Sequence, residues 1–242
     1  MNNKSALITG AAKRIGAAIA KKLHQAGLDI IIHHNTSSED AKNLANELNK
    51  TRPNSAMILQ ANLIDDTSYK KLIDDAFNFK NRLDVLVNNA SVFYPTEISN
   101  ISIDQWNETI NTNLKAPLFL SHYAAGYLEK NHGCIVNIAD IHGEKPLKDH
   151  TIYCISKSGL ITLTESLAKE LAPNIRVNGI SPGAITWPET MDNDTKNLIL
   201  DNSALKKAGS MEDISKAVLF LVNDADYITG QVINVDGGRA LY

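Results

Sequence analysis

Short apolar runs alternate with helical segments along most of this 242-residue chain. Ser5 to Thr9 predicts a buried strand, and Ile15 to Gln25 predicts the helix after it, because its apolar residues recur at helical spacing. Later strands are expected at Asp29 to His33, Ala56 to Gln60, Leu83 to Asn88, Cys134 to Ile138, Arg176 to Ile180 and Val232 to Val235, and two further helices at Ser38 to Asn49 and Thr67 to Phe79. Such alternation gives parallel strands joined by right-handed crossovers, with helices on both faces. The pattern therefore predicts a doubly wound, Rossmann-type α/β fold.

A single domain over residues 1–242 accounts for the chain, because no repeat and no Pro/Gly/Ser-rich linker divides it. Hydrophobic residues make up 43% and charged residues 21%, as is typical of globular proteins. The formal net charge is −3, without a run of five like charges, which argues against a nucleic-acid or membrane partner. Two cysteines, no signal-peptide core near Met1 and no apolar stretch of about 18 residues favour a reduced, cytoplasmic protein.

One irregular segment, residues 181–194, directly follows the sixth expected strand and carries two of the seven prolines. Doubly wound sheets bind their ligands outside the carboxyl ends of the strands. The segment is therefore predicted to be a substrate loop, with an ordinary surface connection as the alternative.

The turn between the first strand and the first helix is rich in small residues. Gly10 permits a sharp turn, Gly16 allows close packing of helix and strand, and the helix N-terminus offers amide groups to a pyrophosphate. A P-loop is excluded, because Ala17-Ala18 follows Gly16 where that motif needs Lys and Ser/Thr. The turn predicts a dinucleotide site, although any first strand–helix unit needs a tight turn.

The end of the second strand bears on the choice of dinucleotide. An acidic residue there accepts hydrogen bonds from the ribose of NAD, but this chain has His33, His34, Asn35, Thr36 and Ser37. Several of these side chains can donate to a 2′-phosphate, and the nearby Lys13-Arg14 pair adds positive potential. NADPH is therefore favoured over NADH, and a metal site at the two histidines is disfavoured for want of further ligands.

Tyr153 and Lys157 lie four residues apart at the start of an expected helix, and therefore share one helical face. A phenol is a poor acid–base catalyst near neutral pH, and a neighbouring ammonium group would lower its pKa. Such a pair also arises by chance, so its meaning depends on the surrounding motifs.

Several motifs in this chain occur together and in a fixed order. They are Thr9-Gly10-x3-Arg14-Ile15-Gly16, Asn88-Asn89-Ala90, Asn113, Tyr153-x3-Lys157, Pro182-Gly183, and Thr229-Gly230-Gln231 followed by Asp236-Gly237-Gly238. This order resembles the short-chain dehydrogenase/reductase family over essentially the whole chain. The resemblance implies that Tyr153 donates the proton, that Lys157 binds the nicotinamide ribose and lowers the tyrosine pKa, and that Asn113 holds a relay water. The implied cofactor residues are Gly10, Lys13, Arg14, Ile15, His33, Asn35, Ser37, Asn62, Leu63, Asn89, Ala90, Ser91, Tyr153, Lys157, Pro182 and Gly183.

Three departures from the common family pattern coincide. Asp140 stands thirteen residues before Tyr153, where most members carry serine, and Arg14 replaces the second glycine of the turn. With the segment 88–96 they resemble the pteridine reductase branch, and the segment 181–189 resembles the loop of its bacterial members, although Thr36 stands where that branch often has arginine. The resemblance implies a pterin site formed by Arg14, Ser91, Phe93, Asp140, Tyr153 and Trp187, with Phe93 stacked on the heterocycle.

The leading hypothesis is therefore an NADPH-dependent reductase of dihydrobiopterin, dihydromonapterin or dihydrofolate-like substrates, with a carboxyl group and a phenol supplying the proton. A 3-oxoacyl or other carbonyl reductase of the same family is the alternative enzyme, and a non-catalytic NADP sensor is an alternative of another class. The resemblance also implies a homotetramer.

Overall fold

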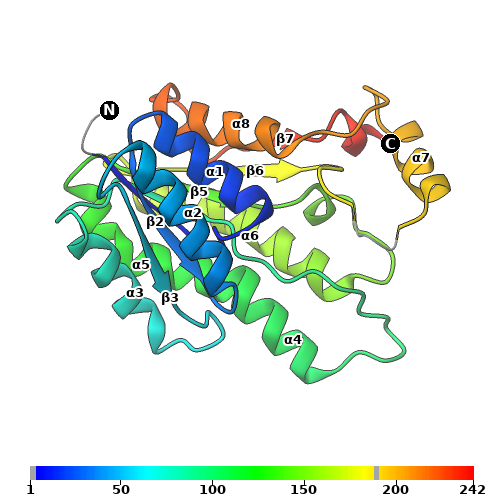
Figure 1. Cartoon of the computed structure of the whole chain (residues 1–242). Coiled ribbons are helices and arrows are strands. Elements are labelled where there is room, and N and C mark those ends of the chain that lie inside the picture. The colour runs from blue at the N-terminus through cyan, green and yellow to red at the C-terminus, as the bar shows by residue number, and fades with distance from the viewer. Residues whose placement is uncertain (1–3, 188–190) are drawn as a thin grey trace.

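The computed structural model describes residues 4–187 and 191–242, and its centre is a seven-stranded parallel sheet of order β3-β2-β1-β4-β5-β6-β7 (Figure 1). The strands are β1 (Ser5–Ile8), β2 (Asp29–His34), β3 (Ala56–Gln60), β4 (Val85–Asn88), β5 (Cys134–Ile138), β6 (Arg176–Pro182) and β7 (Val232–Val235). All seven expected strands are present: β3, β5 and β7 have the expected bounds, and each of the other four differs at one end by one or two residues. The predicted doubly wound, single-domain α/β fold is confirmed.

Helices cover both faces of the sheet. They are α1 (Arg14–Gln25), α2 (Ser38–Thr51), α3 (Ser68–Asn78), α4 (Ile103–Ile110), α5 (Ala116–Glu129), α6 (Thr151–Glu170), α7 (Asn193–Asp201) and α8 (Met211–Asn223), with 3-10 turns η2 (Ile141–Gly143) and η3 (Arg239–Leu241). One buried apolar cluster joins α1, α2 and α8 to the sheet, and a second joins α3, α5 and α6 to its other face. The core is therefore two apolar layers, one on each side of the strands.

One turn of helix between α4 and α5 has an unexpected form. Residues Asn111–Lys115 (η1) form a π-helical turn, and α4, η1 and α5 run on as one continuous helical segment. The apolar pattern carries no sign of it, because a π turn is set by one extra residue in the hydrogen-bond ladder and not by hydrophobic periodicity.

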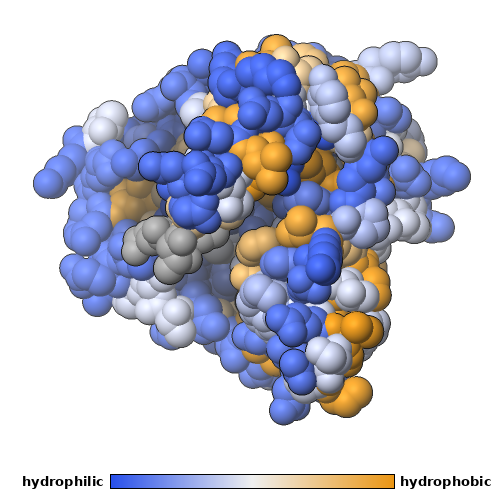
Figure 2. All heavy atoms as spheres, turned by 90° about the vertical axis from the view of Figure 1, so that its right-hand side faces the viewer, coloured by the Kyte–Doolittle hydropathy of each residue, from blue (hydrophilic) through white to orange (hydrophobic). Residues whose placement is uncertain are grey.

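The strand order changes direction at β1, which pairs with β2 on one side and with β4 on the other. Ligands of such sheets bind in the crevice at this position, outside the carboxyl ends of the strands. Figure 2 looks onto the side of the molecule that carries α7 and the C-terminus in Figure 1, and hydrophilic residues dominate that face. The functional side chains are therefore expected at the loops that follow β1, β2, β4, β5 and β6.

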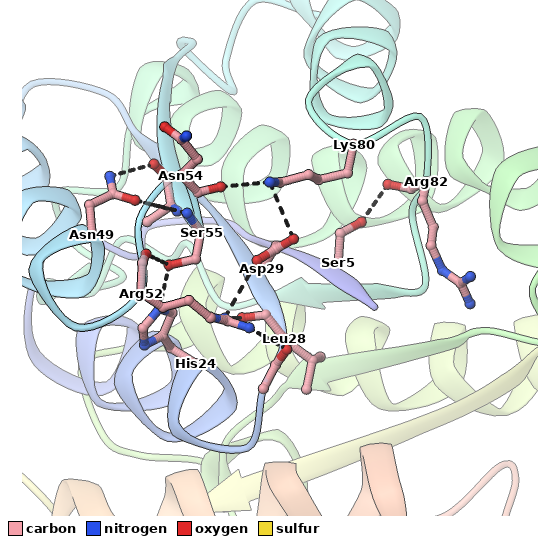
Figure 3. Close-up of polar contacts among 12 residues, drawn as sticks. Ser5, His24, Leu28, Asp29, Asn49, Arg52, Asn54, Ser55, Lys80 and Arg82 are labelled. Carbon is pink, nitrogen blue, oxygen red and sulfur yellow. Dashed lines mark hydrogen bonds and ion pairs between the residues drawn. The ribbon is translucent and has the colours of Figure 1, made fainter. Parts of the chain in front are cut away.

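A polar network lies at the opposite end of the sheet, where the strands begin (Figure 3). Asp29 lies 3.5 Å from both Arg52 and Lys80, while His24 and Ser55 share a buried hydrogen bond of 2.6 Å. Burial and the Arg52 guanidinium lower the pKa of His24. These contacts tie α1, α2 and the α3–β4 connection together away from the candidate site, so they serve stability.

Within the described ranges, no helix has the length and apolar content needed to cross a bilayer. The same part of the chain holds no group of three or more metal-ligating side chains. The structure describes the predicted substrate loop 181–194 except for residues 188–190. The expectation for the N-terminus falls partly on residues 1–3. Residues 1–3 and 188–190 lie outside the described residues.

Candidate active site

The turn after β1 is shaped by two glycines. Gly10 has a φ of +61°, and a Cβ atom there would lie 2.9 Å from the Cα atom of Ala90. A Cβ atom on Gly16 would lie 2.4 Å from the carbonyl oxygen of Gly10. Neither position tolerates a side chain, so α1 starts directly against the turn.

The segment after β4 holds this turn in place through hydrogen bonds. The backbone N–H groups of Asn89 and Ala90 donate to the Thr9 hydroxyl at 2.9 and 3.0 Å. The Asn89 amide donates to the carbonyl oxygens of Thr9 (2.8 Å) and Gly10 (3.1 Å). Asn89 and Ala90 therefore fix the backbone on which a dinucleotide would lie.

The N-terminus of α1 suits an anion. The N-cap residue Lys13 makes no side-chain capping hydrogen bond, the first turn carries no acidic residue, and Lys13 and Arg14 are exposed. Arg14 adopts a φ of +50°, which is uncommon for a residue with a side chain. With the glycine cradle, these features fit the pyrophosphate of a nicotinamide dinucleotide. Lys13 also forms an exposed ion pair with Asp40 at 2.9 Å.

His33 differs from its expected role as a phosphate donor. The side chain is buried, its Nδ1 accepts from the Gly10 N–H at 3.1 Å, and its Nε2 donates to the Ala61 carbonyl at 3.1 Å. Burial lowers the pKa of His33 to about 4, so the ring is neutral at neutral pH. Both ring nitrogens are therefore engaged within the protein, whereas Asn35 and Thr36 are exposed and Ser37 is half-buried.

Two further expected cofactor residues, Asn62 and Leu63, lie in the segment after β3. Asn62 is exposed, and its Oδ1 accepts from the Ile64 N–H at 3.1 Å, whereas Leu63 is buried. Ile15 is half-buried in the first turn of α1.

The centre of the candidate site is a direct contact between a carboxylate and a phenol. The Tyr153 hydroxyl donates to Oδ2 of Asp140 at 2.8 Å, and Oδ1 of Asp140 accepts from the His142 N–H at 2.8 Å. Tyr153 lies in the first turn of α6, and Asp140 lies at the carboxyl end of β5. The twelve residues between them thus form a connection that brings both groups to one point.

Lys157 lies one turn further along α6. Its Nζ is buried, donates to the Ile138 carbonyl at 2.8 Å and lies 5.6 Å from the centre of the Tyr153 ring. Burial lowers the pKa of Lys157 to about 8, against a smaller opposing effect of the Asp140 charge.

The pKa of Tyr153 runs against the expected direction. Burial, followed by the charge and hydrogen bond of Asp140, raises it well above 10. In this structure those effects outweigh the Lys157 ammonium group, because the phenol is desolvated and faces a carboxylate at hydrogen-bond distance. Tyr153 is therefore protonated at neutral pH, as a proton donor must be.

Asn113 sits inside the π-helical turn and is buried. Its Oδ1 accepts from the Val92 N–H at 2.9 Å, and its Nδ2 donates to the Val92 carbonyl and to the Ser156 hydroxyl, both at 3.1 Å. Ser156 in turn donates to the Tyr153 carbonyl at 2.7 Å. Asn113 thus joins the loop after β4 to the helix that carries Tyr153.

Phe93 projects from that loop and is 52% exposed. Its edge-to-face contact with Tyr153 has a centroid distance of 4.7 Å, and His150 stacks on it at 4.7 Å with an interplanar angle of 17°. Sequence reasoning missed His150, and its position at the N-cap of α6, three residues before Tyr153, was the available signal.

The remaining expected site residues lie around this centre. Ser91 is exposed in the loop before Phe93, and Pro182 ends β6. A Cβ atom on Gly183 would lie 2.6 Å from the Cα atom of Asp236, so the C-terminal segment packs directly on it. Trp187 is half-buried at the last described position before the gap.

Comparison with known proteins agrees with this arrangement. A family model described as enoyl-(acyl carrier protein) reductase matches residues 10–240. The chain belongs to the short-chain dehydrogenase/reductase family. A 3-oxoacyl-(acyl-carrier-protein) reductase of Aquifex aeolicus is 35% identical, covering 98% of each chain. Pteridine reductase 1 of Leishmania tarentolae is also 35% identical, covering 98% of this chain and 96% of its own. Short-chain dehydrogenase/reductase proteins are oxidoreductases that use nicotinamide cofactors.

Proposed function

We propose that this short-chain dehydrogenase/reductase is an NADPH-dependent pteridine reductase, which reduces the C=N bond of a dihydropterin. The observation that carries the proposal is the 2.8 Å hydrogen bond between Tyr153 and Asp140. Ketone reduction places developing negative charge on an oxygen, which a neighbouring carboxylate would repel. Reduction of C=N instead requires a proton on a ring nitrogen, and a phenol paired with a carboxyl group can deliver one.

The chain's own residues would bind, orient and protonate the substrate. When bound, the cofactor would supply the hydride to carbon. Tyr153, kept protonated by its raised pKa, would donate to the ring nitrogen, and a proton from solvent would return to the phenolate by way of Asp140, across their shared hydrogen bond. Lys157 would bind the nicotinamide ribose from the same face of α6. Asn113 would hold a relay water and, through its bonds to Val92 and Ser156, keep the loop after β4 and α6 in register.

Phe93 to alanine is expected to weaken binding of a dihydropterin or a diaminopteridine inhibitor by about 1 to 3 kcal/mol, because an exposed stacking surface is lost. His150 already covers part of the ring, so the heterocycle would use the face that His150 leaves open. Isothermal titration with NADPH present measures the change, and NADPH affinity is the internal control. Equal inhibitor affinity in both proteins would remove Phe93 from the pterin site.

NADPH is expected to bind at least tenfold more tightly than NADH, a difference of about 1.4 kcal/mol, since one charge-assisted contact to a phosphate can supply that much. Asn35 to aspartate should narrow or reverse the preference, because a carboxylate at this exposed position repels the phosphate. Fluorescence titration of both cofactors tests this. Equal dissociation constants in the wild-type protein would contradict it.

Reduction of 3-oxoacyl thioesters is the second candidate, and it is favoured by the 35% identity to the Aquifex aeolicus enzyme. A panel of dihydropterins, 3-oxoacyl thioesters and simple ketones, followed by absorbance of the reduced cofactor, separates the two. Turnover of the thioester in preference to every dihydropterin would overturn the pteridine reductase assignment. The pterin proposal also includes a homotetramer, which light scattering would measure.

A further inference from the structure

A cavity of about 370 Å³ lies between the turn that follows Asp140 and the C-terminal turn. His142 and Lys145 line one side, Arg239 and Tyr242 line another, and Asn202 lies at the end of α7. We propose that this cavity binds an anionic side chain, a carboxylate or a phosphate ester, carried by the substrate whose ring is reduced at Tyr153. The inference rests on the proposed pteridine reductase function and specifies its substrate class.

The cavity is connected to Asp140 through the lining residues Ile141 and His142, which follow it in the chain. Its wall begins immediately after Asp140, whose carboxylate is joined to the His142 N–H at 2.8 Å. The opposite wall belongs to the turn that packs on Gly183, whose N–H donates to the Val235 carbonyl at 3.1 Å. A substituent that extends from a ring bound beside Asp140 would therefore meet this cavity.

The charge of the lining is positive. Lys145 and Arg239 face the cavity with no ion-pair partner among the residues that the structure describes, and no Asp or Glu side chain lines it. The nearby Asp236 is already engaged, since its two oxygens accept from the N–H groups of Gly238 (2.9 Å) and Ala240 (2.7 Å). The positive groups are thus not neutralised by the neighbouring carboxylate.

The wall that carries Arg239 is held in place. The Asp236 hydrogen bonds fix the 3-10 turn η3, and the Leu205 N–H donates to the Gly237 carbonyl at 2.9 Å. Lys206 lies 5.8 Å from the centre of the Tyr242 ring, which adds a further positive group beside the cavity. Hydrogen bonds therefore hold the backbone in place on both sides of Arg239.

An anionic side chain fits this chemistry. Guanidinium groups bind carboxylates and phosphates through paired N–H donors, and an ammonium group adds a second positive charge. The volume is several times the share of one water molecule, about 30 Å³, so it admits an extended chain as well as its charged end. Glutamyl carboxylates and phosphate esters share this chemistry.

The test compares ligands that differ only in charge. A diaminopteridine with a glutamate tail and the same molecule with both carboxylates converted to amides are titrated onto the NADPH-bound protein by fluorescence. A matched pair, a pterin with a phosphorylated or a free side-chain hydroxyl, separates the phosphate source from the carboxylate source. We expect the anionic member of at least one pair to bind tenfold or more tightly, and this ratio to fall in 0.5 M salt, roughly the range where surface charges are screened.

Two single variants, Lys145→Ala and Arg239→Ala, are expected to bring the ratio for that pair towards one. Lys148→Ala, an exposed lysine three residues from Lys145 that does not line the cavity, is the matched control and should keep the wild-type ratio. A wild-type ratio near one for both pairs, or a ratio untouched by Arg239→Ala, would overturn the anion site while the uncharged ligands still bind. Failure of every pteridine to bind would instead overturn the proposed function.

Discussion

Replacing Tyr153 by phenylalanine is expected to lower turnover of a dihydropterin by about two orders of magnitude or more, since general acid catalysis contributes on that scale. The substitution removes only the hydroxyl that donates to Asp140 and leaves the ring in contact with Phe93. Affinity for NADPH should therefore change little. Single-turnover kinetics and cofactor titration measure the two quantities separately.

The matched comparison is Lys157 to alanine, which should weaken both turnover and cofactor binding. The thermal midpoint of each variant must also be recorded, because Tyr153 to phenylalanine leaves one Asp140 oxygen without its partner, at a cost of about 1 kcal/mol or more. A phenylalanine variant that is folded and keeps most of its turnover would refute the assignment of Tyr153 as proton donor.

Replacing Asp140 by serine is expected to reduce dihydropterin turnover by about 10²-fold, while fold and NADPH affinity are kept. Serine can donate to a carbonyl oxygen but cannot exchange a proton with the phenol at pH 7. Simple ketones should therefore lose much less activity than dihydropterins, and a slight gain is compatible with the chemistry. The ratio of the two activities, measured on one protein preparation, is the decisive quantity.

The pH profile gives a second readout for Asp140. Lys157 has a pKa lowered to about 8, and the Asp140 charge opposes that lowering. The same charge raises the pKa of Tyr153. Both groups must be protonated for the proposed roles, so activity falls as pH rises through these values, and removal of Asp140 moves both pKa values down. The fall in activity at alkaline pH should accordingly occur at lower pH in the serine variant. Unchanged dihydropterin kinetics together with an unchanged pH profile would show that Asp140 takes no part in the reaction.

The sequence predicts the layers of this fold well, because the inner strands β1, β2, β4 and β5 are short, mostly apolar runs that are almost entirely buried. The sequence also allows Asp140 and Tyr153 to be placed close together. Asp140 follows an expected strand, and Tyr153 lies at the start of an expected helix, four residues before Lys157. What periodicity cannot supply is the direction of a buried polar side chain. His33 looked like a donor at a strand end, yet its ring turns inward to the Gly10 N–H and becomes neutral.

The raised pKa of Tyr153 was unpredictable for a related reason. Sequence spacing shows that an ammonium group is near the phenol, but the balance depends on desolvation and on which oxygen the hydroxyl meets. The stacking of His150 on Phe93 and the cavity beside Arg239 join segments far apart in the chain, so neither leaves a local signal.

The π-helical turn at Asn111–Lys115 constrains how this chain can change over evolution. Losing one residue there would return the segment to regular α-helical hydrogen bonding, but it would also rotate Asn113 by about 100° relative to the helix beyond it. Val92 would then lose both of its hydrogen bonds to the Asn113 side chain. A deletion would therefore make the helix more regular and would break the link between the loop after β4 and the helix that carries Tyr153. Regular α-helical hydrogen bonding and the observed position of Asn113 therefore exclude one another at this turn.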